Sequence, residues 1–461
     1  MKHWQYGVAV VTLSLLLLAH CSAQPRAASG VTVLEGATVI DGVSSAPIED
    51  AVLVIEGERI RSLGRRGSVE VPNDATRINA AGKTILPGLI SLHGHVGRTE
   101  GIEANEEYFN RARIQRDANA YLYYGLTHVL SLGHDREAIF AFLADQRAGK
   151  TTGARLYTAG LGFGAKNGWP RNPYVHRPTN PAEARAMARQ ELANRPGFLK
   201  LWVDDRLGQS PPFPPEVYGP ILEEARQQGV RATAHVYYLT DAKELMRRGV
   251  AALAHSVQDQ EVDQEFLALA KQNGVVQILT LTGIRKNVDY VENPDFLSDA
   301  ALRVLFPAPV LAVFASKGYR DSLAKDFDLN LIRRQSEVAA KNAKKIADAG
   351  LSVAVGTDSG LVGSFPGLWE HREMELLVEA GLTPLQALQA ATVNGARFLG
   401  IDRDYGSLEP GKVADFLVLS ANPLSDMTRT RQIEAVWMNG KQVDRSALAS
   451  GTVRPVSGEQ K

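Results

Sequence analysis

Strand-like and helical segments alternate repeatedly between residues 88 and 400, and this alternation restricts the possible folds more than any other feature of the chain. Short apolar runs typical of buried strands occur near residues 88–92, 125–132, 154–160, 198–203, 231–236, 251–256, 275–282 and 352–357. Helical stretches such as 182–194 and 216–229 lie between them. Alternating strands and helices form parallel sheets, and eight such units close naturally into a barrel. The sequence therefore predicts an α/β fold with a (β/α)₈ TIM barrel over residues 88–400.

Both ends of the chain predict a second, smaller domain. Residues 31–87 contain "VTVLEGATVID", "AVLVIEGERIRSLG" and "TRINAAGKTILPG", which alternate apolar and polar residues and break at Gly, Asp and Asn. Residues 406–443 repeat this pattern in "GSLEPGKVADFLVLS" and "IEAVWMNGKQV". Such alternation is typical of short antiparallel strands. We expect residues 24–87 and 401–461 to build one β-sandwich domain together.

The first residues have the features of a signal peptide. Lys2 and His3 precede the apolar run "VAVVTLSLLLLA", and "HCSAQ" follows it. The run is too short for a convincing membrane span, so we expect a signal peptide over residues 1–23, cleavage after Ala23, and a secreted or periplasmic protein. The alternative is a lipoprotein anchored to the membrane through an acylated Cys21, although His20 makes the lipobox poor. Cys21 is the only cysteine, so disulfide bonds are not expected in the mature chain.

Charge gives no sign of a macromolecular partner. Lys and Arg together number 51, and Asp and Glu also number 51, so no excess charge favours nucleic acid or an anionic membrane surface. We expect a small-molecule partner. The sequence leaves the oligomeric state open, including a homo-oligomer.

Candidate metal ligands stand at the ends of the predicted strands, where barrel enzymes carry their chemistry. In "PGLISLHGHVG", residues 87–97, His93 and His95 are two residues apart, so in a strand they point the same way and form a chelating pair. The other candidates at or near predicted strand ends are Lys200, His235, His255 and Asp358.

Neutral imidazoles and a carboxylate suit zinc, whereas an ammonium ion repels a cation and offers no lone pair. Desolvation would lower the pKa of Lys200, and the neutral amine would react with carbon dioxide to give a carbamate, which can bridge two metals. We expect two divalent ions, one held by His93, His95 and Asp358 and the other by His235 and His255. A bridging hydroxide would be a strong nucleophile, and Asp358 would pass its proton to a leaving amine. A snorkelling or salt-bridged lysine is the alternative for Lys200.

These motifs resemble the amidohydrolase superfamily in its binuclear, carboxylated-lysine branch, over almost the whole mature chain. The resemblance implies a barrel with an attached β-sandwich and the ligands His93, His95, Lys200, His235, His255 and Asp358. The segment "HREMELLVEAGLTPLQALQAATVNGARFLG", residues 371–400, resembles the subgroup of imidazolonepropionase and the prolidase-like dipeptidases. Imidazolonepropionases are typically mononuclear and lack the bridging lysine, so Lys200 favours the dipeptidase-like relatives.

Four further residues are candidates for substrate contact. Tyr237 shares a strand face with His235 and would donate its hydroxyl to a developing oxyanion, while His134 stands at the end of the second strand. Asp205, beside Asp204, would receive a basic group of the substrate, and His371 would line the pocket. The alternatives are a packed tyrosine, a hydrogen-bonded histidine, solvated carboxylates and a structural histidine. We expect the loop 163–181 and the stretch 284–330 to shape the pocket.

These features predict an exported metal-dependent hydrolase of an amide-type C–N bond in a small N-acyl amino acid, dipeptide or cyclic amide. A lactone, ester or phosphotriester substrate is the alternative within the same chemistry. A metal-binding protein without catalysis is the rival class, and Asp358 argues against it because a structural site has no use for a proton shuttle.

Overall fold

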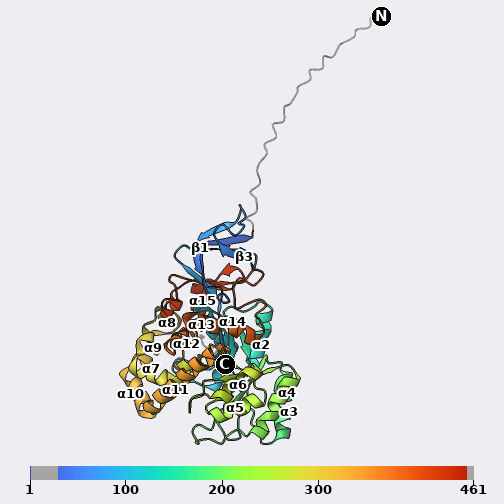
Figure 1. The fold of residues 1–461 in the computed structure, drawn as a ribbon, viewed down its shortest axis with the longest axis vertical. Coiled ribbons are helices and arrows are strands. Elements are labelled where there is room, and N and C mark those ends of the chain that lie inside the picture. The colour runs from blue at the N-terminus through green and yellow to red at the C-terminus, as the bar shows by residue number, and fades with distance from the viewer. Residues whose placement is uncertain (2–29, 454–461) are drawn as a thin grey trace.

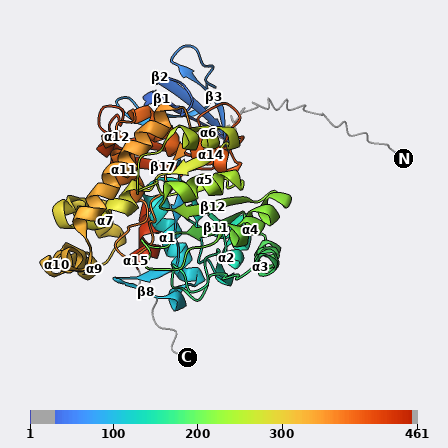
Figure 2. The same ribbon diagram turned by 60° about the horizontal axis from the view of Figure 1, so that its bottom comes forward.

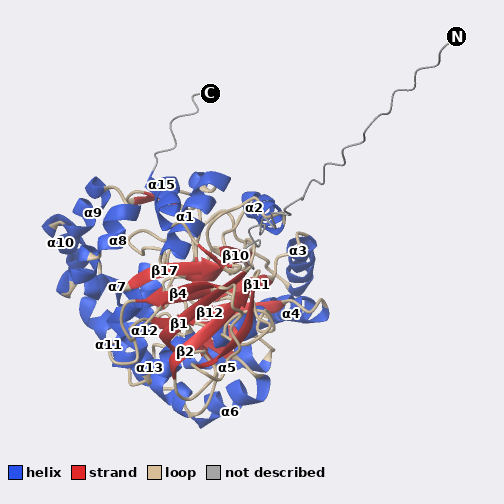
Figure 3. Cartoon of the chain, turned by 90° about the horizontal axis from the view of Figure 1, so that it is seen from above, coloured by secondary structure: helices blue, strands red, loops and turns tan. Residues whose placement is uncertain are grey.

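Two parallel sheets contain the eight strands predicted for the central region, in a computed structural model that describes Met1 and residues 30–453. The first sheet has the order β10-β9-β6, and the second has the order β11-β12-β13-β14-β15. The strands are β6 (Leu89–Gly94), β9 (Leu126–Ser131), β10 (Arg155–Thr158), β11 (Phe198–Val203), β12 (Arg231–Val236), β13 (Ala252–Ala254), β14 (Val276–Ile278) and β15 (Val353–Ala354). Figure 3 shows the strands at the centre of the molecule with helices around them.

Backbone hydrogen bonds connect the edges of the two sheets. The amide of Leu92 in β6 donates to the carbonyl of Val355, which follows β15, at 2.8 Å. On the other side, the amide of Phe163, which follows β10, donates to the carbonyl of Lys200 in β11, also at 2.8 Å. Parallel strands followed by helices in this arrangement are typical of a TIM-barrel-type α/β fold.

Helices follow the strands and begin at recognisable caps. Those between β6 and β14 are α1 (Arg111–Tyr123), α2 (Glu137–Arg147), α3 (Pro181–Ala193), α4 (Pro215–Gln227), α5 (Leu239–Arg247) and α6 (Gln264–Asn273). The side chain of Asn180 accepts a hydrogen bond from the amide of Glu183, and Pro181 occupies the first turn of α3. Both residues stabilise a helix start at this position. The helices predicted over 182–194 and 216–229 are confirmed as α3 and α4.

The stretch 284–330 is mainly helical. It contains most of α7 (Leu281–Glu292), then α8 (Ala300–Leu305), α9 (Ala308–Ala315), α10 (Lys317–Asp326) and the start of α11 (Leu329–Asp348). The side chains of Asp299, Ser316 and Asp328 cap α8, α10 and α11. The strand expected over 275–282 also ends early, at Ile278, because Thr280 has a φ of 50° and caps α7. Figure 2 shows α7 and α9–α11 at one side of the molecule.

Strands from both chain ends form one eight-stranded sheet, as their alternating pattern predicts. Its order is β18-β17-β16-β5-β1-β2-β3, with β4 paired to β1. The strands are β1 (Val31–Val39), β2 (Ile48–Glu56), β3 (Arg59–Arg65), β4 (Thr76–Asn79), β5 (Thr84–Pro87), β16 (Phe416–Leu419), β17 (Ile433–Met438) and β18 (Lys441–Gln442). The sheet is mixed rather than antiparallel, because β1 pairs in parallel with β4 and β5. Phe416 stacks on Trp437 within its core, with ring centroids 5.2 Å apart. In Figure 1 this sheet lies above the barrel region.

Three of the last helices lie between β15 and β16 in the chain, and the fourth follows β18. They are α12 (Leu368–Glu379), α13 (Pro384–Ala390), α14 (Val393–Leu399) and α15 (Arg445–Val453). Short elements complete the chain: β7 (Thr99–Glu100), β8 (Glu103–Ala104), and the 3₁₀ turns Glu106–Tyr108, Pro294–Ser298 and Met427–Arg431. Within the described part of the chain, no helix is both long and apolar enough to cross a membrane. The predicted signal peptide and Cys21 lie outside the described residues.

Candidate metal centre

Side chains from four of the parallel strand ends meet around one carboxylate. Nε2 of His93 lies 2.7 Å from Oδ1 of Asp358, and Nε2 of His95 lies 3.4 Å from the same oxygen. Nε2 of His255 lies 3.9 Å from Oδ2 of Asp358. The ring of His235 packs on the ring of His255, with centroids 4.3 Å apart. The cluster therefore unites β6, β12, β13 and the segment after β15, as the strand-end argument predicted.

The imidazoles of the cluster are neutral near pH 7. Burial lowers the pKa of His93 to about 3, and it also lowers the pKa of His95, His235 and His255. Burial alone would raise the pKa of the Asp358 carboxyl, but the neighbouring histidines hold it well below its ordinary value. Neutral imidazole nitrogens and an ionised carboxylate are the forms that bind a divalent metal.

Lys200 is fully buried in β11. Its Nζ has no hydrogen-bond partner among the described residues and lies 5.6 Å from the centre of the Trp202 ring. Burial lowers the pKa of this amine to about 7, although Asp358 acts in the opposite direction. A large fraction of Lys200 is therefore uncharged at neutral pH, which is the reactive form of the amine. The alternative of a salt-bridged lysine finds no support in the part of the chain that the structure describes, where Nζ has no hydrogen-bond partner.

The donor set fits a divalent metal. His93, His255 and Asp358 each offer one ligand atom, and these atoms lie within 4.8 Å of one another. Unpaired buried nitrogens on Lys200 and on His95 lie in the same region. Nitrogen and oxygen ligands in this number suit zinc and its neighbours among the divalent metals.

Left-handed backbone conformations occur repeatedly around the cluster. The φ angles are 59° at Asp358, 73° at His255, 65° at His134 and 50° at Thr280. Residues other than glycine rarely adopt the left-handed backbone region, and backbone strain of this kind is concentrated at functional sites. These residues therefore hold their side chains in directions that a regular strand would not give.

Two polar contacts orient two of the candidate ligand histidines. Nε2 of His235 lies 3.0 Å from Oδ2 of Asp204, and Nδ1 of His255 lies 2.6 Å from Oγ1 of Thr280. Each contact occupies one ring nitrogen and leaves the other for a metal. Partners of this kind fix the tautomer and the ring direction of a ligand histidine.

Two buried glutamates of α12 support the loops that carry the cluster. The carboxylate of Glu373 accepts hydrogen bonds from the amides of Leu281 and Thr282, at 2.8 Å each, directly after Thr280. Oε1 of Glu370 accepts from the hydroxyls of Thr357 at 2.8 Å and Ser359 at 2.6 Å, on either side of Asp358. The two glutamates are three residues apart and share one face of the helix. One helix therefore supports both His255 and Asp358.

Two adjoining cavities contain the cluster. The first, which we call the histidine cavity, has a volume of about 270 Å³. Its lining includes His93, His95, Arg98, Glu106, His134, Trp169, Arg171, Asn172, Lys200, Trp202, His235, His255 and Asp358. The second, which we call the α11 cavity, has a volume of about 510 Å³. Its lining includes Trp169, Asp204, Arg206, His235, Tyr237, His255, Ile284, Asp326, Asp328, Leu331, Ile332, Gln335 and Asp358.

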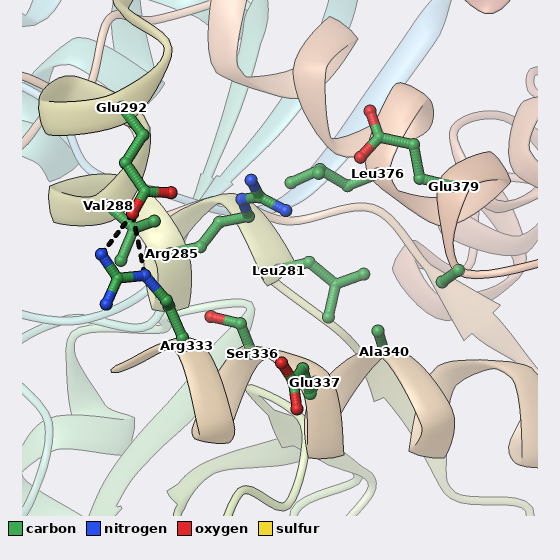
Figure 4. A pocket seen from close by; sticks show the side chains of 11 residues that line it. Leu281, Arg285, Val288, Glu292, Arg333, Ser336, Glu337, Ala340, Leu376 and Glu379 are labelled. Carbon is green, nitrogen blue, oxygen red and sulfur yellow. Dashed lines mark hydrogen bonds and ion pairs between the residues drawn. The ribbon is translucent and has the colours of Figure 1, made fainter. Parts of the chain in front are cut away.

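A further cavity of about 270 Å³ lies between α7, α11 and α12 and contains none of the candidate metal ligands. Figure 4 shows Arg333 of α11 paired with Glu292 of α7 at its edge. It shares no lining residue with the two cavities of the candidate active site.

The segments expected to shape the pocket do so. Trp169, Pro170 and Arg171 of the loop 163–181 line the histidine cavity, and Ile284 and Phe327 of the stretch 284–330 line the α11 cavity.

Of the residues predicted to contact the substrate, Tyr237 and His134 line a cavity of the candidate site, whereas Asp205 does not. Tyr237 lines the α11 cavity, where its hydroxyl accepts a hydrogen bond from Nε2 of Gln335 at 2.9 Å. His134 lines the histidine cavity and packs on Trp202, with centroids 4.5 Å apart. Asp205 lines neither cavity and accepts a hydrogen bond from the hydroxyl of Tyr238 at 2.9 Å.

His371 does not reach the pocket, so its assignment as a pocket residue is corrected here. It is fully buried, and its two ring nitrogens lie 2.9 Å from the Tyr124 carbonyl oxygen and 2.9 Å from the Thr430 hydroxyl. The residue begins the segment that resembles the subgroup, but the face of α12 that carries it turns away from the cluster.

Several residues of the site carried no recognisable sequence signal. Arg98, Trp169 and Thr280 stand in irregular segments whose direction a sequence does not give. Glu370 and Glu373 stand among other charged residues of α12, including Arg372 and Glu375, so the sequence pattern does not distinguish them. The sequence places Asp204 and Asp205 side by side. The structure shows that Asp204 contacts His235, whereas Asp205 contacts Tyr238.

Comparison with known proteins gives consistent matches. Residues 84–443 match the model of the amidohydrolase family. An ochratoxinase from Aspergillus niger is 25% identical over 89% of this chain and 86% of its own length. An imidazolonepropionase from Deinococcus deserti is 42% identical over 108 residues, which are 23% of this chain and 27% of that protein. The solved structure of a Xaa-Pro dipeptidase with bound methionine has a TM-score of 0.72 and 21% identity, over 90% of this chain and 99% of the other.

Proposed function

Because the chain belongs to the amidohydrolase family, in its imidazolonepropionase-like and prolidase-like subgroup, we propose that it is an exported metal-dependent hydrolase of an amide-type C–N bond. The proposed substrates are small N-acyl amino acids, dipeptides or cyclic amides. The observation that carries this proposal is the meeting of His93, His95 and His255 around Asp358. The dipeptidase among the similar structures supports it, since a dipeptidase hydrolyses a peptide C–N bond.

We propose two divalent metal ions, most simply zinc. His93, His95 and Asp358 would hold one, and His235 and His255 the other. When bound, the metals would activate a water molecule and polarise the carbonyl group of the substrate. Six candidate ligands exceed the needs of one tetrahedral ion, which supports the binuclear arrangement.

Lys200 would bridge the two metals after carboxylation. The neutral Nζ would attack the carbon of carbon dioxide, so that an N–C bond forms while one C–O π bond opens onto oxygen. The nitrogen would then release one proton to water, which gives a carbamate with one negative charge. The full burial of Lys200 and its unpaired Nζ support this assignment.

Two residues would act directly on the substrate. Asp358 would accept the proton of the attacking water and transfer it to the leaving nitrogen, since it lines both cavities. Tyr237 would donate its hydroxyl proton to the carbonyl oxygen, because that hydroxyl accepts from Gln335 and its own proton stays available. His134 would contact the substrate in the histidine cavity.

We further propose that the eight parallel strands close into a (β/α)₈ barrel and that the mixed sheet belongs to a β-sandwich. The hydrogen bonds of Leu92 and Phe163 support closure. Residues 1–23 would be removed on export, and acylation of Cys21 is the alternative. Intact-mass analysis of exported protein tests this: a chain that begins at Gln24 is expected, and a lipid on Cys21 would replace the proposal with a membrane anchor.

A substrate screen tests the function. Purified protein loaded with zinc is incubated with N-acyl amino acids, dipeptides, cyclic amides, lactones and phosphotriesters, and product formation is measured by chromatography. Hydrolysis of one of the amide classes is expected. Hydrolysis confined to lactones, esters or phosphotriesters would replace the amide proposal, and metal binding without turnover on any class would favour a non-catalytic protein.

A further inference from the structure

The cavity between α7, α11 and α12, which we call the helix cavity, contains none of the candidate catalytic residues. Its volume is about 270 Å³, and Figure 4 shows side chains from all three helices around the space. The apolar part of its lining consists of Leu281, Val288, Ala340, Leu376 and Ala380. A concave surface with an apolar lining and a few polar groups is typical of a small-molecule site.

The charged residues of the helix cavity leave one carboxylate without a partner. Each arginine in or beside the lining donates to a carboxylate at 2.7 or 2.8 Å; the pairs are Arg285–Asp289, Arg333–Glu292 and Arg372–Glu379. Glu337 is the remaining charged residue of the lining, and it is exposed. In the part of the chain that the structure describes, its carboxylate has neither a hydrogen bond nor an ion pair.

The two cations that α11 places one turn from Glu337 pair with other residues. Arg333, four residues earlier, pairs with Glu292, and Nζ of Lys341, four residues later, lies 3.8 Å from Oε1 of Glu261. Cations at these positions are the ones that could neutralise a helical glutamate. The helix cavity therefore keeps one negative charge beside an apolar wall, which suits a small organic ammonium ion.

Helices α7 and α11 form a wall between the helix cavity and the α11 cavity. Adjacent residues on each helix line different cavities, because Ile284 and Gln335 line the α11 cavity whereas Arg285 and Ser336 line the helix cavity. Gln335 also donates to the hydroxyl of Tyr237 at 2.9 Å. A molecule in the helix cavity therefore packs against the reverse side of the candidate active site.

The start of α7 connects the helix cavity to His255. The side chain of Leu281 lines the cavity, and its amide donates to Glu373 at 2.8 Å. The hydroxyl of the preceding residue, Thr280, lies 2.6 Å from Nδ1 of His255. Leu376 follows Glu373 by three residues on α12 and lines the same cavity. Packing against Leu281 and Leu376 therefore acts on the contacts that orient His255.

We propose that the helix cavity is an effector site for a small organic ammonium ion with an apolar body. The ammonium group pairs with Glu337, and the apolar body packs against Leu281 and Leu376. Occupancy restrains the start of α7 and so the contact between Thr280 and His255, and effector and metal therefore strengthen each other's binding. The proposal rests on the candidate metal centre and holds whichever bond the enzyme hydrolyses.

Binding of 2-phenylethylammonium to the full chain loaded with zinc tests the site. Its neutral analogue, 2-phenylethanol, keeps the apolar body and lacks the charge. In calorimetric titrations at pH 7, the ammonium ion should bind about fivefold more tightly than the alcohol, and Glu337→Gln should remove this difference. Asp348→Asn changes an acidic residue of α11 that pairs with Lys344 outside the cavity, and it should keep the difference. A difference that survives Glu337→Gln would overturn the proposed pairing.

A second variant locates the bound molecule. Ala340→Trp fills the helix cavity and leaves every charge in place, so it should abolish the binding of both compounds. Binding that persists in a folded Ala340→Trp chain would place the ammonium ion elsewhere, such as against the carboxylates of the α11 cavity, and would overturn the proposal. Glu337 is exposed, so Glu337→Gln keeps the test decisive if the tryptophan variant fails to fold.

The affinity for zinc gives the readout of the effector role. It is measured by competition with a chelator of known affinity, with and without saturating 2-phenylethylammonium. Zinc should bind about fivefold more tightly when the ammonium ion is present. Thr280→Ala lacks the hydroxyl beside His255, so it should still bind the ammonium ion but lose this gain. An unchanged or lower zinc affinity in the native chain, or a full gain in Thr280→Ala, would overturn the proposed coupling.

Discussion

Oδ2 of Asp204 lies 3.0 Å from Nε2 of His235, whereas the adjacent Asp205 accepts a hydrogen bond from Tyr238. Only Asp204 lines a substrate cavity and touches a candidate metal ligand. The two neighbouring carboxylates therefore have different contacts. The contact between Asp204 and His235 allows a test of whether His235 binds a metal.

Asp204→Asn should weaken metal binding about 10- to 100-fold, because the amide no longer offers the charged acceptor that fixes the His235 ring. The measurement is competition for zinc against a chelator of known affinity. Asp205→Asn is the matched control and should leave the zinc affinity unchanged, since Asp205 pairs with Tyr238 instead. Equal losses in both variants would indicate a general effect of charge rather than the His235 contact.

Thr280→Ala should also lower the zinc affinity, by about tenfold, because Nδ1 of His255 loses the hydroxyl that lies 2.6 Å away. Thr280→Ser keeps that hydroxyl and should bind zinc as the native protein does. Both variants share the left-handed backbone at this position, so strain affects them alike. The idea fails if the serine variant loses as much affinity as the alanine variant.

The sequence predicts those parts of the site that depend on local pattern. His93 and His95 follow from their spacing at the end of β6, and the eight strand positions follow from apolar runs between helices. The contact of Glu373 with the amide of Leu281 joins residues 92 positions apart, and no local pattern encodes it. The contacts of His371 could not be predicted from the sequence either. Which neighbour each face of α12 packs against depends on the whole fold, and His371 lies against the Tyr124 carbonyl.

Stability should depend on pH through Asp135. Burial raises the pKa of this carboxyl to about 7, so the folded chain keeps a proton that the unfolded chain releases above about pH 4. The contribution of Asp135 to the free energy of unfolding is therefore full below about pH 4 and is lost as the pH rises to about 7.

Asp135→Asn removes this titration while the amide can still bond the hydroxyls of Ser131 and Thr158. Urea unfolding of both proteins between pH 4 and pH 8 should show the native protein losing stability relative to the variant, by up to about 1.4 kcal/mol per pH unit. A difference that stays constant across this range would contradict the raised pKa.

Metal stoichiometry distinguishes a binuclear centre from a mononuclear one. We expect two zinc ions per chain by elemental analysis of fully active protein, because the proposed ligands would divide into a set around His93 and a set around His235. His235→Ala should lower the count to about one and reduce turnover by at least about 100-fold, since only one set stays complete. Full activity with a single ion per chain would exclude the binuclear proposal.

Substitutions of Lys200 distinguish a bridging carbamate from the other roles of a buried lysine. Lys200→Ala should lose the bridge, lower the metal content and reduce turnover by at least about 1000-fold, because a bridging ligand orders both ions. A short carboxylic acid such as acetate or propionate can enter the vacated space and offer two oxygens to the metals, so rescue should be partial and should saturate with acid concentration. Small amines should give no rescue, whereas a lysine that acts as a cation predicts the opposite. Lys200→Arg keeps the charge but cannot form a carbamate, so a metal-replete and active arginine variant would remove the carbamate from the mechanism.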